Sequence, residues 1–168
     1  IRIKNEIVSG KEGGYTKLFP EGKFTTIFDA VEEYKKRGVD LIVIGGKEYG
    51  TGSSRDWAAK GTKLLGIKAV IAESFERIHR SNLIGMGVLP LQFTEDNNRK
   101  KLKLLGSELI NILGVENIVD PNKNIEVEFK YQSGEIKRIK TLCRIDTNNE
   151  LEYYKNGGIL HYVLRNML

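Results

Sequence analysis

Three short apolar runs constrain the fold of this chain more than any other feature. They are Leu41–Ile44, Ala69–Ala72 and Val88–Phe93, and runs of this kind are typical of strands buried on both faces of a sheet. The segments between them, Arg55–Leu65 and Phe75–Met86, have the length and pattern of helices. Because strand, helix and strand in this order join parallel neighbours by right-handed crossovers, we expect a layered α/β domain.

The rest of the sequence predicts a mostly parallel core sheet followed by a strand hairpin. Helical spacing or a strand-like pattern marks six further segments: helices at Thr25–Arg37, Lys100–Leu105, Leu151–Lys155 and Ile159–Asn166, and a hairpin of Ile125–Tyr131 with Ile136–Ile145. Ser53 or Ser54 is expected to cap the helix that starts at Arg55, and Ser74 the next one. With 168 residues, the chain is long enough for one domain, 1–168.

Composition narrows the possible partners. The single cysteine, Cys143, excludes an internal disulfide, cannot supply a metal cluster alone, and is expected to be buried. It fits a reducing compartment, so a cytoplasmic location is expected, with the mitochondrion as the alternative.

The net charge of +5 suits anionic partners such as polycarboxylates or RNA, or simply a lysine-rich solvated surface. No run of about 18 apolar residues occurs, so no membrane span is expected.

A glycine-rich loop followed by a polar helix start carries the clearest functional signal. Gly45–Gly52 follows a predicted buried strand, and Ser53, Ser54 and Arg55 open the next helix. Ligands of parallel α/β sheets bind beyond the carboxyl ends of the strands, and a helix N-terminus attracts anions. Glycines let the backbone approach a ligand closely, and an arginine fork can grip a carboxylate.

These residue types alone leave two interpretations open. The loop is not a dinucleotide fingerprint, because Arg55 occupies the third glycine position, and neither a Walker loop nor a G-x-S-x-G elbow is present. A carboxylate or phosphate site remains possible. The alternative is a glycine-rich turn with a serine cap and a surface arginine.

The surrounding sequence closely resembles the aconitase family, in the branch of bacterial aconitase A and the cytosolic aconitase/iron regulatory proteins. Gly-Ser-Ser-Arg at 52–55 is preceded by Gly-Lys-Glu-Tyr-Gly and followed by Asp-Trp-Ala-Ala-Lys-Gly. The resemblance continues through the segments 64–70, 74–83 and 85–91, and it recurs at 156–160. It therefore covers nearly the whole chain.

The resemblance implies a fold, a reaction and a cofactor. The fold is the swivelling β/β/α domain at the C-terminus of a longer multidomain polypeptide. The reaction is the reversible isomerisation of citrate and isocitrate through cis-aconitate. A [4Fe-4S] cluster, held by three cysteines of the other domains, acts as a Lewis acid on the departing hydroxyl. No metal ligand is expected within this chain.

Residue roles follow from the same resemblance. Ser53 matches the serine whose alkoxide removes and returns the proton at carbon, and Ser54 and Arg55 match residues that hold a substrate carboxylate. The family's cluster cysteines are absent, as is a substrate-binding arginine expected before Ile1. The isolated domain is therefore expected to fold but to be inactive, and to need the remaining domains of its polypeptide.

Two other functions remain as alternatives. In iron regulatory proteins, the residues matching Arg55, Asp56 and Trp57 lie where RNA replaces substrate, which makes them possible RNA contacts. The small subunit of isopropylmalate isomerase also uses Gly-Ser-Ser-Arg, but its loop usually reads Asn-Phe-Gly-Cys-Gly-Ser-Ser-Arg-Glu-His, unlike this chain. Both histidines, His79 and His161, are expected to be structural or surface residues.

Overall fold

The computed structural model describes residues 9–11, 14–16, 27–52, 55–94, 97–106, 108–117 and 120–168. The elements, in chain order, are β1 (Ser9–Lys11), β2 (Gly14–Thr16), α1 (Ile27–Lys36), β3 (Leu41–Ile44), α2 (Arg55–Leu64), β4 (Ile67–Ala72), α3 (Arg77–Gly85), β5 (Leu89–Phe93), β6 (Leu109–Leu113), the 3₁₀ turn η2 (Val115–Asn117), β7 (Asn124–Lys130), β8 (Ile136–Cys143), α4 (Asn148–Lys155) and α5 (Ile159–Met167). The residues Ile1–Lys4, whose sequence is also typical of a strand, lie outside the described residues.

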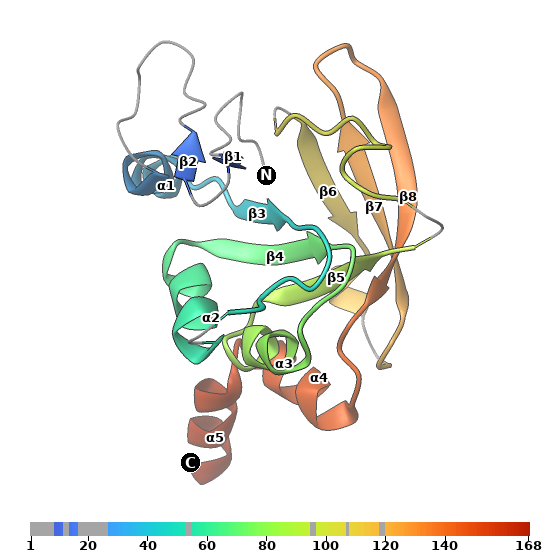
Figure 1. The fold of residues 1–168 in the computed structure, drawn as a ribbon. Coiled ribbons are helices and arrows are strands. Elements are labelled where there is room, and N and C mark those ends of the chain that lie inside the picture. Colours follow the sequence, from blue (N-terminus) through green and yellow to red (C-terminus); the bar gives the residue numbers. More distant parts are fainter. Residues whose placement is uncertain are drawn as a thin grey trace.

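One six-stranded sheet organises the domain, in the order β3-β4-β5-β8-β7-β6. Its first three strands are parallel, as the three apolar runs predict. The predicted hairpin is also confirmed, and β8 pairs antiparallel with β5, so that the hairpin continues the parallel half of the sheet. In Figure 1, β7 and β8 stand upright beside the parallel strands, while α2 and α3 lie below them. The α/β class is confirmed.

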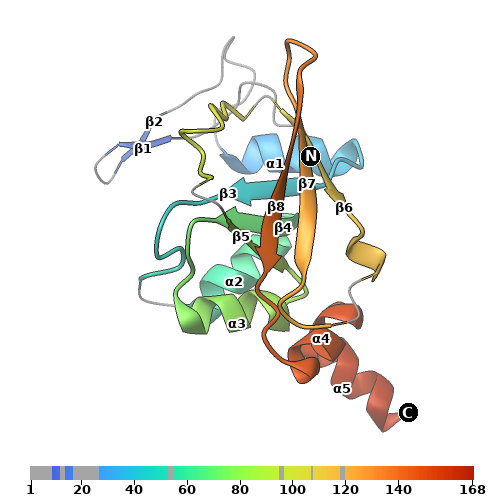
Figure 2. The same cartoon turned by 90° about the vertical axis from the view of Figure 1, so that its right-hand side faces the viewer.

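Side-chain alternation explains why the parallel strands are covered on both faces. In β4, Ala69 and Ile71 belong to one apolar cluster, and Val70 and Ala72 belong to the other. The first cluster contains buried side chains of β5, β7 and β8. In the second cluster, side chains of the parallel strands pack with side chains of α1, α2 and α3. Figure 2 shows α1 above β3, and the helices α2 and α3 below the parallel strands. The apolar run at residues 69–72 thus reflects burial on both sides.

Two local predictions fail, and one strand was not predicted. Residues 100–105 form turns and not a helix, although Leu102 and Leu104 are buried in the core. The strand that was not predicted is β6, whose side chains alternate between exposed and half-buried. Ser74 does not cap α3: the cap is Glu76, whose side chain accepts a hydrogen bond from the His79 backbone N–H. The predicted caps Ser53 and Ser54 lie outside the described residues.

A buried ionic cluster attaches α3 to α4. Arg80, whose side chain is 8% exposed, donates from Nη1 and Nη2 to the two carboxylate oxygens of Glu150, each at 2.9 Å. It also donates to the carbonyl of Arg144 at 2.7 Å, and Asp146 lies 3.4 Å from its Nε. Two-fold hydrogen bonding of this kind fixes the relative positions of the two helices.

The last helix leaves much of its apolar surface uncovered. Leu160, Leu164 and Met167 of α5 are exposed, and Figure 1 shows the helix projecting from the body of the domain. Among the described residues, no helix has both the length and the apolar character needed to cross a bilayer.

Candidate functional site

A pocket of about 380 Å³ lies where the loop after β3 leads into α2. This is the carboxyl edge of the parallel strands, where the sequence predicts a ligand site. Its volume is within the range of small-molecule sites, about 300–1,000 Å³. Eight residues line it: Tyr49, Gly50, Thr51, Gly52, Arg55, Ala58, Thr62 and His79.

The loop that forms one wall is attached to the segment after β4 by backbone hydrogen bonds. The N–H of Tyr49 donates to the carbonyl of Ser74, and the N–H of Glu76 donates to the carbonyl of Tyr49, both at 2.9 Å. The Glu48 N–H adds a 2.7 Å hydrogen bond to the Ser74 hydroxyl. Tyr49 and Phe75 thereby form an isolated parallel bridge. Two loops far apart in sequence therefore act as one unit.

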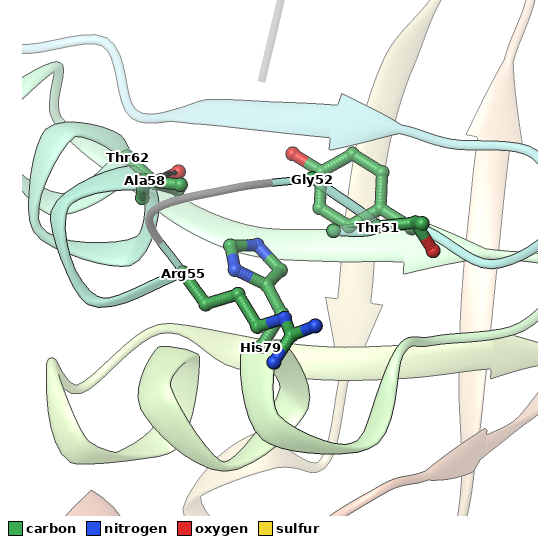
Figure 3. A pocket seen from close by; sticks show the side chains of 8 residues that line it. Thr51, Gly52, Arg55, Ala58, Thr62 and His79 are labelled. Atoms are coloured by element: carbon green, nitrogen blue, oxygen red, sulfur yellow. Dashed lines mark hydrogen bonds between the residues drawn. The ribbon is translucent and has the colours of Figure 1, made fainter.

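Arg55, the first residue of α2, lines the pocket. Figure 3 shows its side chain running from the helix start toward α3, past His79. Its Nε lies 3.2 Å from Oε2 of Glu76, yet among the described residues this N–H has no hydrogen-bond partner, so the contact is ionic. Ser53 and Ser54, the other predicted site residues, lie outside the described residues. The pocket therefore contains a guanidinium at the positive end of a helix.

His79 and Tyr49 form the apolar side of the pocket. His79 is 2% exposed, its ring centroid is 5.5 Å from that of Tyr49, and its Nδ1 has no hydrogen-bond partner within the described residues. Burial lowers the pKa of His79 and outweighs the opposing effects of the Arg55 backbone and of Glu76. Burial also raises the pKa of Tyr49. Both rings are therefore neutral near pH 7.

The lining role of His79 was missed by sequence reasoning. His79 and Leu83 are four residues apart on α3 and both are buried, a spacing that places them on one face of the helix. That spacing indicates burial, but it contains no signal for a pocket.

The three possible RNA contacts have different surroundings. Arg55 lines the pocket, whereas Asp56 accepts a hydrogen bond from the Asn82 side chain of α3. Trp57 is 69% exposed, and the Nζ of Lys60 lies 4.8 Å from the centroid of its ring. A large aromatic ring beside a cation thus stands on the surface next to the pocket.

The described residues offer no metal centre of their own. No group of three or more His, Cys, Asp or Glu side chains within them could hold an ion. Cys143 is fully buried in β8, as predicted, and burial raises the pKa of its thiol. His161 lies exposed on α5. These residues therefore do not fit an iron-sulfur cluster.

Comparison with known proteins shows which family and which relatives this chain is similar to. The family described as "Aconitase C-terminal domain" matches residues 1–96. Aconitate hydratase A of Pseudomonas aeruginosa is 60% identical over 168 residues, which is 100% of this chain and 18% of that protein. Aconitate hydratase A of Legionella pneumophila is 62% identical over 165 residues, 98% of this chain and 18% of that protein.

Among solved structures, a 3-isopropylmalate dehydratase of Methanocaldococcus jannaschii is similar at a TM-score of 0.48 and 23% identity. That similarity covers 86% of this chain and 81% of the other. The chain spans about a fifth of the length of the curated relatives that it matches. The sequence match over more than half of its residues settles its membership: the chain belongs to the family of aconitase C-terminal domains.

Proposed function

We propose that this chain is the C-terminal domain of an aconitate hydratase, and that it supplies a proton-transferring serine and a carboxylate-binding group for the isomerisation of citrate and isocitrate through cis-aconitate. The observation that carries the proposal is the pocket at the start of α2, which places Arg55 beside a glycine-rich loop. The identity of 60% to an aconitate hydratase A over the whole chain supports the same reaction.

Each residue of the proposed site has a separate task. The Ser53 alkoxide takes the proton from the substrate carbon while the substrate's hydroxyl group leaves as hydroxide, which gives cis-aconitate. An acid supplied by the remaining domains protonates the hydroxide to water, and Ser53 returns its proton to carbon in the reverse step. Ser54 and Arg55 hold a substrate carboxylate, because a guanidinium fork matches the two carboxylate oxygens. An ordinary serine hydroxyl is a weak base. The positive start of α2 and the guanidinium are the groups of this chain that would stabilise its alkoxide.

The iron-sulfur cluster of the proposed enzyme belongs elsewhere in the polypeptide. Cys143 is buried in the core, and the described residues contain no ligand set. We therefore place the cluster ligands, and the rest of the substrate site, in the domains that make up the remaining length of the relatives. It follows that this chain alone should not turn over citrate.

Replacing Ser53 in the full-length enzyme tests the proposal. Ser53→Ala should lower kcat by roughly 10²–10⁴-fold, the usual contribution of a general base, and leave KM for citrate nearly unchanged. Ser133→Ala, in the exposed turn between β7 and β8, is the control and should retain full activity. Near-normal turnover of Ser53→Ala would remove the base assignment.

A second function, RNA binding, is favoured by one observation. Trp57 is exposed beside the pocket with Lys60 against its ring, and aromatic rings near cations suit stacking on unpaired bases. We propose testing the full-length, cluster-free protein with an iron-responsive hairpin in a gel-shift assay. Trp57→Ala should abolish the shift. A shift that persists in the variant and disappears steeply with salt would indicate attraction to phosphate alone.

A further inference from the structure

The charged group nearest to Arg55 is the carboxylate of Glu76. The distance from Arg55 Nε to Glu76 Oε2 is 3.2 Å, and the two side chains are 35% and 18% exposed. The Nε N–H of Arg55 is buried and has no hydrogen-bond partner among the described residues, so the contact with Glu76 is one of charge. Glu76 therefore lies on the Nε side of the guanidinium.

Glu76 is itself firmly held. It caps α3, its Oε2 accepts a hydrogen bond of 2.8 Å from the His79 backbone N–H, and its own N–H donates to the carbonyl of Tyr49. The His79 hydrogen bond is the largest effect on its pKa and lowers it; the Ile78 N–H and the charge of Arg55 act in the same direction. The carboxylate is therefore a fixed anion near pH 7.

We infer that Glu76 is a positioning residue, which fixes the Arg55 guanidinium so that its two terminal nitrogens receive the substrate carboxylate end-on. A free arginine side chain samples many rotamers, and holding it in one of them before the ligand arrives removes part of the entropy cost of binding. Because the Glu76 carboxylate already lies 3.2 Å from Nε, the inferred grip is through the two terminal nitrogens. This inference rests on the proposed function of Arg55.

Two simpler roles for Glu76 predict different results. If Glu76 only caps α3, replacing it changes the stability of the protein. KM then changes no more than it does for other substitutions near the site. If it acts only as a nearby negative charge, its removal should favour an anionic substrate and lower KM. A positioning role predicts the opposite sign, a higher KM, together with dependence on Arg55.

The test uses the full-length enzyme with Glu76→Gln, which removes the charge but keeps an oxygen for the His79 N–H. Glu76→Asp is the second variant; it keeps both charge and capping ability but shortens the reach to Arg55. Both should raise KM for citrate about tenfold, with kcat changed less and Tm nearly unchanged. Glu152→Gln, on the exposed face of α4, is the control and should behave as wild type.

A double-mutant cycle completes the test. In an Arg55→Lys background, Glu76→Gln should change KM less than about twofold, because the group that it positions is already gone. An unchanged or lowered KM in Glu76→Gln, or an equal rise in both backgrounds, would overturn the inference. Wild-type enzyme without any citrate isomerisation would instead refute the proposed function itself, so the two failures are distinguishable.

Discussion

Gly50 lies directly against the imidazole of His79: a Cβ atom built at Gly50 would stand 2.2 Å from the ring's Cγ. The contact joins the loop that forms one wall of the pocket to the buried face of α3. Gly50 also has a φ of 95°, a backbone conformation that favours glycine. Both the close approach and the dihedral angle require glycine here.

Gly50→Ala should therefore destabilise the chain and displace the loop. The left-handed backbone costs about 1–2 kcal/mol for a residue with a Cβ, and displacing the ring adds to it, so we expect a loss of about 3 kcal/mol in the free energy of unfolding. Gly46→Ala is the matched control, since nothing lies within 4 Å of its Cβ position. Urea denaturation measures both, and equal stabilities would contradict the packing described.

His79 should make stability fall as the pH is lowered from neutral. Its folded-state pKa is lowered, mainly by burial, so the unfolded chain takes up a proton first, below about pH 6.5. The contribution of His79 to the free energy of unfolding is complete above its unfolded-state pKa. It is lost as the pH falls through that pKa toward the lower folded-state pKa. The lowered pKa values of Glu76 and Glu150 act in the more acidic carboxylate range.

The measurement is the free energy of unfolding in urea at about pH 7.5 and about pH 5.5. His79→Gln should flatten the dependence. His161→Gln should leave it as in the wild type, because His161 is the exposed one of the two histidines. A pH dependence that survives in His79→Gln would contradict the assignment.

Glu150→Ala should cost about 3 kcal/mol, at the lower end of what breaking a buried pair costs. The change leaves Arg80 buried without its bidentate partner, although Asp146 stays within 3.4 Å. Burial opposes the ionisation of Glu150, but hydrogen bonds from Arg80 and from the Asp146 N–H outweigh it and lower its pKa. Glu152→Ala, two residues further along α4 and in an exposed pair with Lys155, should cost less than about 0.5 kcal/mol. Thermal unfolding that ranks the two variants equally would argue against the cluster.

Arg55→Lys should lower kcat/KM for citrate in the full-length enzyme by about 10- to 100-fold, the value of a charge-assisted hydrogen bond. Lysine keeps the positive charge but not the two-pronged geometry. Arg138→Lys is the control, because Arg138 is exposed on β8. This variant should leave the steady-state kcat/KM for citrate unchanged. If charge alone suffices, Arg55→Lys will behave as the control does.

Much of the fold could be predicted from the sequence, because the patterns that indicate its strands and loops are local. The buried strands Leu41–Ile44 and Ala69–Ala72 differ from their surroundings in apolar content alone, and the glycine-rich loop before Arg55 is a contiguous motif. Cys143 was correctly placed inside for the same kind of reason, since a lone cysteine is usually buried. The helix predicted at 100–105 failed because its buried residues, Leu102 and Leu104, are two positions apart, a spacing that does not place two side chains on one face of a helix.

By itself, the sequence determined the three buried parallel strands, the helix that starts at Arg55 and the loop that precedes it, because each depends on neighbouring residues. Only the tertiary structure decided that Glu76 and His79 meet Arg55. Pairing of β3 with β4 brings the loops that follow the two strands together through Tyr49 and Phe75. Contacts across more than 20 residues of sequence arise from that pairing, and no local pattern encodes them.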